Sequence, residues 1–199
     1  LFLFVFGVLS ILLLEHNHAF KGLSWHQALF DSLFQSATTR SAGLQTIDVS
    51  HFSDATNIIM SILMFIGSSP SSVGGGIRTT TFAILILFII NFNNTADKTG
   101  IKAFNREIHI MDIQRSFAVF TMASILTFVS MIIIAATEQG KLTFIQIFFE
   151  VMSAFGTCGL SLGATDDISN LTKIVLMILM FIGRVGLISF IIILAGRKE

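Results

Sequence analysis

Apolar residues fall into four long runs along this chain, separated by short amphipathic segments and polar turns. The runs cover residues 1–14, 58–91, 117–137 and 171–195. Since the hydrocarbon core of a bilayer is about 30 Å thick, a helix needs roughly 20 apolar residues to cross it. The pattern therefore predicts membrane-spanning helices, the first of which is the truncated tail of a span.

Two shorter amphipathic runs, residues 25–37 and 142–155, lie between the spans, and each leads into a turn that contains glycine. Runs of this length are more typical of re-entrant or buried helices than of spans. We therefore predict two short helices that enter the membrane and return, with glycine turns at residues 38–46 and 155–161.

The second apolar run is too long for one helix. At about 1.5 Å per residue, it would reach roughly 50 Å, well beyond the bilayer core. Non-helical backbone at membrane depth is tolerated where protein or a water-filled cavity satisfies its polar groups. We predict an intramembrane loop that faces an aqueous path. It consists of Gly67, Ser68, Ser69, Pro70, Ser71, Ser72, Val73, Gly74, Gly75 and Gly76.

The chain contains an internal repeat. The pattern of residues 53–67 recurs at residues 169–183, at an offset of 116, and the same offset relates Gly43 to Gly159. Each copy consists of a span, a short helix, a glycine turn and a second span. With two crossings per copy, both copies have one orientation in the membrane and can surround an axis normal to it. This arrangement predicts a pore.

The repeat divides the chain into three parts. Residues 1–97 form one pore repeat, residues 98–115 a cytoplasmic loop and residues 116–199 the next repeat. The predicted fold class is an all-α integral membrane protein. Its repeated unit is a span, a re-entrant pore helix, a filter turn and a second span.

Composition and charge agree with a membrane location. Of the 199 residues, 53% are hydrophobic and 12% are charged, which is typical of membrane proteins. The formal net charge is zero, so there is no electrostatic basis for binding nucleic acid. Basic residues cluster at 92–115 and at the C-terminal end, which places both on the cytoplasmic side. Acidic residues predominate on the outer side, where they would attract cations.

A transition-metal site is not expected. The sequence has no His or acidic pair at i, i+4 spacing within a span, and the single Cys158 excludes a cysteine metal site. Residues 74–80 lack the Walker spacing of a phosphate-binding loop, so no enzyme is predicted. The histidines on the outer face are expected to be solvated loop residues, namely His16, His18, His26 and His51.

The two glycine turns have the chemistry of an ion filter. An ion in a narrow pore exchanges its water shell for fixed oxygens, which inward-pointing backbone carbonyls supply. Glycine permits backbone conformations that a Cβ opposes, so carbonyls can be aimed at one axis. The alternative is that each glycine ends a short helix. The candidate filter residues are Thr39, Arg40, Ser41, Ala42 and Gly43, and Phe155, Gly156, Thr157, Cys158 and Gly159.

Four segments resemble a known family of transporters. Residues 37–43, 64–83, 153–161 and 180–186 are similar to the third and fourth repeats of KtrB-like ion-translocating subunits. These subunits belong to the Trk/Ktr/HKT superfamily of potassium transporters. The resemblance covers essentially the whole chain, and the motifs occur in the family's order.

The resemblance implies a multi-pass, potassium-channel-like pore of four repeats in the bacterial plasma membrane. Potassium would pass Gly43 and Gly159 in a filter of backbone carbonyls, with no cofactor on this chain. It also implies a homodimer, contact with membrane lipid, and a cytoplasmic regulatory ring of the KtrA or TrkA type that binds the regulatory nucleotide. Leu44 and Cys158 depart from the commonest family pattern, which could alter the packing behind the filter.

Potassium-selective conduction is therefore the first functional prediction. The alternative is a secondary transporter coupled to sodium or protons, which a carboxylate within a span would favour. The predicted spans contain none. A third interpretation, a sensor that binds a ligand in its re-entrant loops, is not required by the acidic outer side.

Two arginines are predicted at membrane depth. Arg184 lies in the last span, where a charge costs about 2.5–3.5 kcal/mol on insertion scales. Pairing with helix carbonyls is one explanation. By family likeness, Arg184 instead faces the cavity and holds a gating loop formed by Gly67, Ser68, Ser69, Pro70, Ser71, Ser72, Gly74, Gly75 and Gly76. Arg40 is expected behind the filter, paired with Glu150 or Asp31.

Overall fold

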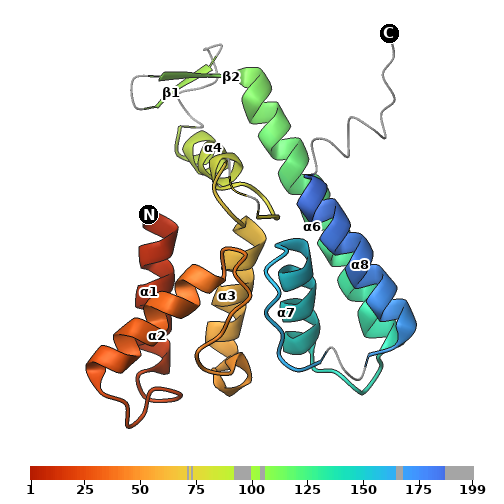
Figure 1. The fold of residues 1–199 in the computed structure, drawn as a ribbon. Helices are drawn as coiled ribbons and strands as arrows, with labels where there is room; N and C mark the ends of the chain where they lie inside the picture. The colour runs from red at the N-terminus through yellow and green to blue at the C-terminus, as the bar shows by residue number, and fades with distance from the viewer. Residues whose placement is uncertain (71, 73, 92–99, 104–105, 165–167, 187–199) are drawn as a thin grey trace.

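The computed structural model describes residues 1–70, 72, 74–91, 100–103, 106–164 and 168–186 (Figure 1). Helices predominate, and two short strands interrupt them. The elements are α1 (Phe2–Glu15), α2 (Trp25–Thr38), the 3₁₀ helix η1 (Val49–His51), α3 (Asp54–Ile66), α4 (Thr79–Ile90), β1 (Gly100–Ala103), β2 (Arg106–His109), α6 (Ile110–Thr137), α7 (Phe144–Phe155) and α8 (Asn170–Val185).

Helix α6 has 28 residues. In the part of the chain that the structure describes, it is the one helix long and apolar enough to cross a membrane by itself. Helices α1, α3, α4 and α7 are apolar but shorter. The predicted run at 171–195 begins as α8, and its part beyond residue 186 lies outside the described residues.

The predicted interruption of the second apolar run is confirmed, because α3 and α4 are separated by residues 67–78. Gly67 follows α3 with a φ of 66°, a conformation that favours glycine at the end of a helix. The returning chain bonds to the helix that it left, since Ile77 N donates to Phe65 O at 3.0 Å. The loop is therefore narrow at its base.

Strands β1 and β2 form an antiparallel hairpin in which Gly100 pairs with His109 and Ala103 pairs with Arg106. The hairpin leads into α6 and lies in the segment predicted as a cytoplasmic loop. The sequence prediction missed it because four-residue strands have too few positions for an alternating pattern to stand out.

Helices α3 and α7 lie side by side between the pair α1 and α2 and the pair α6 and α8 (Figure 1). The short helix α7 contributes to both hydrophobic clusters formed by the described residues. Its Phe149 packs in the cluster with Met60, and its Phe155 packs in the cluster with Leu179. Both phenylalanines are fully buried. Helix α7 therefore joins the two halves of the chain.

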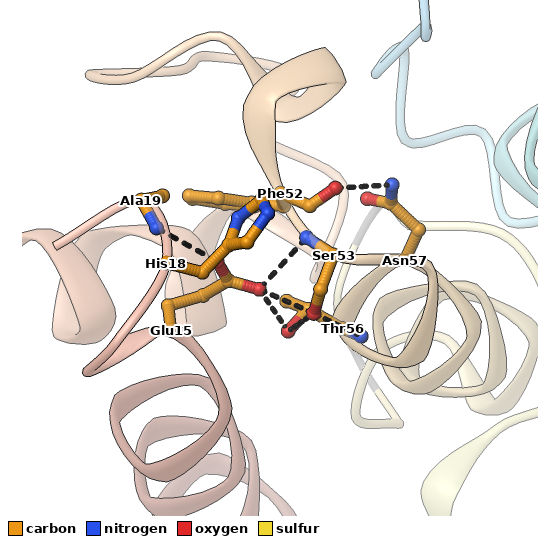
Figure 2. Close-up of polar contacts among 7 residues, drawn as sticks. All are labelled: Glu15, His18, Ala19, Phe52, Ser53, Thr56 and Asn57. Atoms are coloured by element: carbon orange, nitrogen blue, oxygen red, sulfur yellow. Dashed lines mark hydrogen bonds and ion pairs between the residues drawn. The ribbon is translucent and has the colours of Figure 1, made fainter. Parts of the chain in front are cut away.

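Figure 2 shows a buried carboxylate at the start of α3. Glu15 Oε1 accepts hydrogen bonds from Ser53 N at 2.9 Å, Ser53 Oγ at 2.7 Å and Thr56 Oγ1 at 2.5 Å. Its Oε2 accepts from Ala19 N at 3.2 Å. A negative charge is stabilised at a helix N-terminus by the unpaired N–H groups and the helix dipole. These contacts fix α3 to the end of α1.

The same arrangement recurs at the start of α8. Glu138, the residue after α6, accepts from Ser169 N at 2.7 Å and Thr172 Oγ1 at 2.8 Å. Hydrogen bonds from Ser169 and Thr172 lower the pKa of the Glu138 carboxyl to about 2. Glu15 and Glu138 are 123 residues apart and so fall outside the ungapped repeat at 116. Sequence comparison alone therefore found the serines but not their carboxylate partners.

Candidate functional site

The two predicted filter turns touch one another. Gly43 and Gly159 have φ values of 68° and 91°, in the region that favours glycine. The Cα of Gly43 lies 3.7 Å from the position of a Cβ on Gly159. The carbonyl oxygen of Cys158 lies 2.5 Å from the position of a Cβ on Gly43. The structure thus brings together the glycines that the repeat makes equivalent, and it leaves no space for a side chain at residue 43.

The two turns also share an alternating backbone. Ser41 and Thr157, again 116 residues apart, have φ values of 78° and 50°. This region costs an L-residue roughly 1–2 kcal/mol, so such residues persist where the surroundings enforce them. In each turn, positive φ recurs at every second residue, which turns successive peptide groups to the same side. Each turn can therefore present a row of like backbone groups.

Several backbone carbonyl oxygens of the two turns are free to bind a ligand. Among the described residues, no hydrogen-bond donor reaches the carbonyl oxygens of residues 41–43 or 157–159. Most backbone carbonyls in a folded protein have a partner. A set of free carbonyls on two touching turns can replace the water shell of a cation.

Two side chains connect the turns. Cys158 Sγ donates to Thr38 O at 3.0 Å, and Ser41 Oγ donates to Gly156 O at 3.2 Å. The Cys158 thiol supplies a bond that an aliphatic side chain lacks. The sequence did not indicate either contact, because the partners lie more than 100 residues apart.

Each turn is braced from behind by a polar side chain of the preceding short helix. Gln35 of α2 is fully buried, and its Nε2 donates to Ile47 O at 3.1 Å. Glu150 of α7 accepts from Leu162 N at 3.1 Å and from Ser161 Oγ. The braces occupy like places with opposite polarity, since the amide donates to a carbonyl and the carboxylate accepts from an N–H. Sequence analysis had given Gln35 no role.

Gly74 and Gly75, near the end of the predicted gating loop, lie against the two turns. A Cβ on Gly74 would stand 2.5 Å from Ser41 Oγ, and a Cβ on Gly75 would stand 2.8 Å from Thr157 Oγ1. Gly75 N donates to Thr157 Oγ1 at 2.9 Å. Gly74 therefore lies next to Ser41, and Gly75 lies next to Thr157. Side chains on these two glycines would prevent such a close approach.

The prediction that Arg40 pairs with Glu150 or Asp31 is wrong. Arg40 Nη1 donates to Gly67 O at 2.6 Å. Gly67 is the residue that caps α3, and the last carbonyls of a helix carry partial negative charge. The guanidinium therefore pairs with the end of α3 and the start of the loop rather than with a carboxylate.

Arg184, the predicted partner of the loop, is exposed, and it makes no hydrogen bond or ion pair with the described residues. Its neighbour Gly183 does approach the loop, because Gly183 O lies 3.0 Å from the position of a Cβ on Gly75. The role of Arg184 stays a prediction. Ser71, another predicted gating residue, lies outside the described residues.

The helical fold, with two short helices that each end in a glycine turn, is that of a membrane transport protein. The family model TrkH, described as a cation transport protein, matches residues 2–198. The chain belongs to this family. The resemblance found from the sequence and the predicted helical membrane fold are thereby confirmed.

Curated relatives and a solved structure agree with this assignment. Ktr system potassium uptake protein D of Bacillus subtilis is 52% identical over 99% of this chain and 43% of that protein. Potassium/sodium uptake protein NtpJ of Enterococcus hirae is 35% identical over 99% of this chain and 45% of that protein. The crystal structure of the potassium transporter TrkH from Vibrio parahaemolyticus matches the fold with a TM-score of 0.80 at 22% identity, over 99% of this chain and 43% of that one. The chain thus spans less than half the length of these relatives.

Proposed function

We propose that this chain forms part of a potassium-selective pore that carries K⁺ into bacteria across the plasma membrane. In this proposal, residues 39–43 and 155–159 form part of the filter, and residues 67–76 form its gate. The observation that carries it is the pair of touching turns, in which the carbonyl oxygens of residues 41–43 and 157–159 lack donors among the described residues.

The turns have the rigidity that a filter needs. A carbonyl filter discriminates between ions when its oxygens keep their number and positions. Gln35 and Glu150 hold the two turns from behind, and the Cys158 and Ser41 side chains hold them to one another. Relatives named as potassium uptake proteins support K⁺ as the conducted ion.

Passive conduction is favoured over coupled transport. In the described parts of α1, α3, α4, α6 and α8, the carboxylates lie in terminal turns, at Glu15, Asp54 and Asp112. Proton or sodium coupling commonly uses a carboxylate within the membrane. Without one in these helices, entry of K⁺ is driven by the membrane potential and by the acidic outer side.

The complete transporter needs more than this chain. Because the chain spans 43% of its Bacillus subtilis relative, two further pore repeats would complete the filter around one axis. The domain division at residues 97 and 116 makes the present chain the third and fourth repeats. Membership in the TrkH family supports a cytoplasmic regulatory ring of the KtrA or TrkA type, which carries the nucleotide. A homodimer embedded in lipid completes the proposed assembly.

A chimaera tests the proposal directly. In it, this chain replaces the matching segment of the Bacillus subtilis relative, and the host is a bacterium deficient in potassium uptake. We expect growth at limiting potassium and uptake of rubidium. Gly43→Ala should reduce uptake by about tenfold or more, since a backbone cost of roughly 1–2 kcal/mol adds to the overlap with Cys158 O.

Gly140→Ala is the matched control. Gly140 also has positive φ, at 79°, but no atom lies within 4 Å of its Cβ position. This variant carries the same backbone strain far from the turns, so uptake should be close to that of the unmodified chimaera. Equal loss in both variants, or growth that is independent of Gly43, would contradict a filter at the turns.

Arg184 can be tested in the same cells. Although its side chain is exposed, the carbonyl oxygen of the adjacent Gly183 lies 3.0 Å from the position of a Cβ on Gly75, so Arg184 is in position to influence gating. Arg184→Gln should change the rate of rubidium uptake or its dependence on the regulatory ring. An unchanged rate and unchanged regulation, at a normal protein level, would remove Arg184 from the gate.

Transport of potassium coupled to sodium is the second candidate function. It is favoured by the name of one relative, the potassium/sodium uptake protein of Enterococcus hirae, at 35% identity. Uptake of rubidium by the chimaera should be independent of external sodium if conduction is passive and potassium-selective. A requirement for sodium would replace the first proposal with coupled transport.

A further inference from the structure

Two hydrogen bonds tie the loop to the turns, one at each end of the loop. At its start, Gly67 O accepts from Arg40 Nη1 at 2.6 Å. At its end, Gly75 N donates to Thr157 Oγ1 at 2.9 Å. The two ends also meet, since a Cβ on Gly67 would overlap Gly75 O. The two ends of the loop therefore lie together, and one end is bonded to the first turn while the other is bonded to the second turn.

We propose that Arg40 and Thr157 are positioning residues that couple the loop to the filter, so that the loop cannot move without changing the geometry of both turns. This inference rests on the proposed function, and it specifies how the gate and the filter of that pore act on one another. Opening and ion discrimination are then two effects of one conformational change.

The coupling follows from where the ties attach. Thr157 is itself held at a φ of 50°, and Arg40 precedes Ser41, held at 78°. Backbone in this region persists only while surrounding contacts enforce it. When the loop leaves, it withdraws a contact from each strained segment. The peptide groups there can then rotate, and their carbonyl oxygens no longer keep their positions in the filter.

Thr157→Val in the chimaera tests the second tie. Valine keeps the branched shape of threonine but offers no acceptor to Gly75 N. Loss of one hydrogen bond should shift the loop population by roughly two- to tenfold. We expect the rate of rubidium uptake and the potassium-over-sodium discrimination to change together by factors in this range. Thr157→Ser, which keeps the hydroxyl, should restore most of both.

Thr137→Val is the matched control. Thr137 is exposed at the end of α6, and its Oγ1 bonds to Ile133 O of the same helix at 2.6 Å. Neither rate nor discrimination should change. Arg40→Gln tests the first tie by removing the guanidinium, and it should also change both quantities. The Arg40→Gln variant still tests the proposal if the Thr157→Val protein does not reach the membrane.

The outcomes separate the coupling from the proposed function. If the unmodified chimaera takes up no cation, the proposed function fails. If it takes up rubidium and Thr157→Val or Arg40→Gln alters the rate with unchanged discrimination, the loop acts alone and the coupling is wrong. Unchanged rate and discrimination in both variants, at normal protein levels, would overturn it as well.

Discussion

The first turn, residues 39–43, and the second, residues 155–159, share a backbone but differ in the side chains that reach the loop. Positive φ falls at the same two places in each. Where the first turn has Arg40, however, the second has Gly156. A Cβ on Gly156 would stand 2.5 Å from Met64 O, so an arginine cannot occupy that place. The comparison shows that the two turns share one backbone conformation, whereas their side chains make different contacts with the loop.

The contacts that hold the surrounding helices also fall into shared and differing ones. Both helices that follow the turns are capped by a buried glutamate, and each glutamate accepts hydrogen bonds from a serine N and from the Oγ1 of a threonine three residues later. The braces behind the turns, Gln35 and Glu150, are alike in place but not in polarity. Contacts that set the position of a helix are thus repeated, and contacts near the loop and the turns diverge.

Gly156→Ala should have the largest effect, because it places a side chain where the second turn has none. The new Cβ would lie 2.5 Å from Met64 O and 3.1 Å from Met152 O, which are backbone atoms of two packed helices. Overpacking of this kind typically costs about 1–3 kcal/mol. We expect rubidium uptake by the chimaera to fall by about tenfold or more, together with the yield of folded protein in the membrane. Normal yield and uptake would show that α3 and α7 pack more loosely than described.

The two central glycines should differ in their sensitivity. Gly159→Ala meets no atom closer than 3.7 Å, whereas Gly43→Ala meets Cys158 O at 2.5 Å. Both carry the backbone cost of roughly 1–2 kcal/mol for positive φ, but the overlap is specific to residue 43. Rubidium uptake should therefore fall less in Gly159→Ala than in Gly43→Ala. The opposite order would mean that the turns approach one another most closely at residue 159 and not at residue 43.

The braces should give an intermediate effect. Glu150→Ala leaves the Leu162 N–H without its acceptor, which costs about 1–3 kcal/mol for a buried group. Glu150→Gln keeps an acceptor oxygen, so its effect should be smaller. The measurement is the thermal unfolding midpoint of the purified chimaera, alongside the potassium-over-sodium discrimination. Equal midpoints for the two variants would show that the charge of Glu150, and not its hydrogen bonds, sets the stability.

Features that depend on the length of an apolar run or on the internal repeat were predictable from the sequence. The interruption between α3 and α4 follows from a run too long for the bilayer, and the pairing of Gly43 with Gly159 follows from the repeat. Both rest on residue types with few alternatives, such as glycine at positive φ.

Contacts between distant residues were not predictable in the same way. The partner of Arg40 is a backbone carbonyl, which carries no residue-type signal, and the carboxylate caps lie outside the repeat's offset. Glu138 could have been found by asking which acid precedes each Ser-x-x-Thr start of a helix, since Ser169 and Thr172 repeat Ser53 and Thr56. The hairpin of β1 and β2 was missed because its strands are too short to show a period.

The repeated caps should give the smallest effect on transport and a pH dependence of defined sign. The folded pKa of Glu138, about 2, lies below its ordinary value of 4.5 because Ser169 and Thr172 donate to the ionised form. The cap therefore stabilises the fold fully above about pH 4.5, and this contribution is lost as the pH falls towards 2. Glu138→Gln should lower the unfolding midpoint of the purified chimaera by a constant amount at neutral pH, and the difference should shrink below about pH 4.5. Glu15→Gln should lower the midpoint at neutral pH as well, whereas Gln139→Ala, at an exposed neighbour, should not. A difference that grows on acidification would mean that Glu138 is protonated in the folded protein.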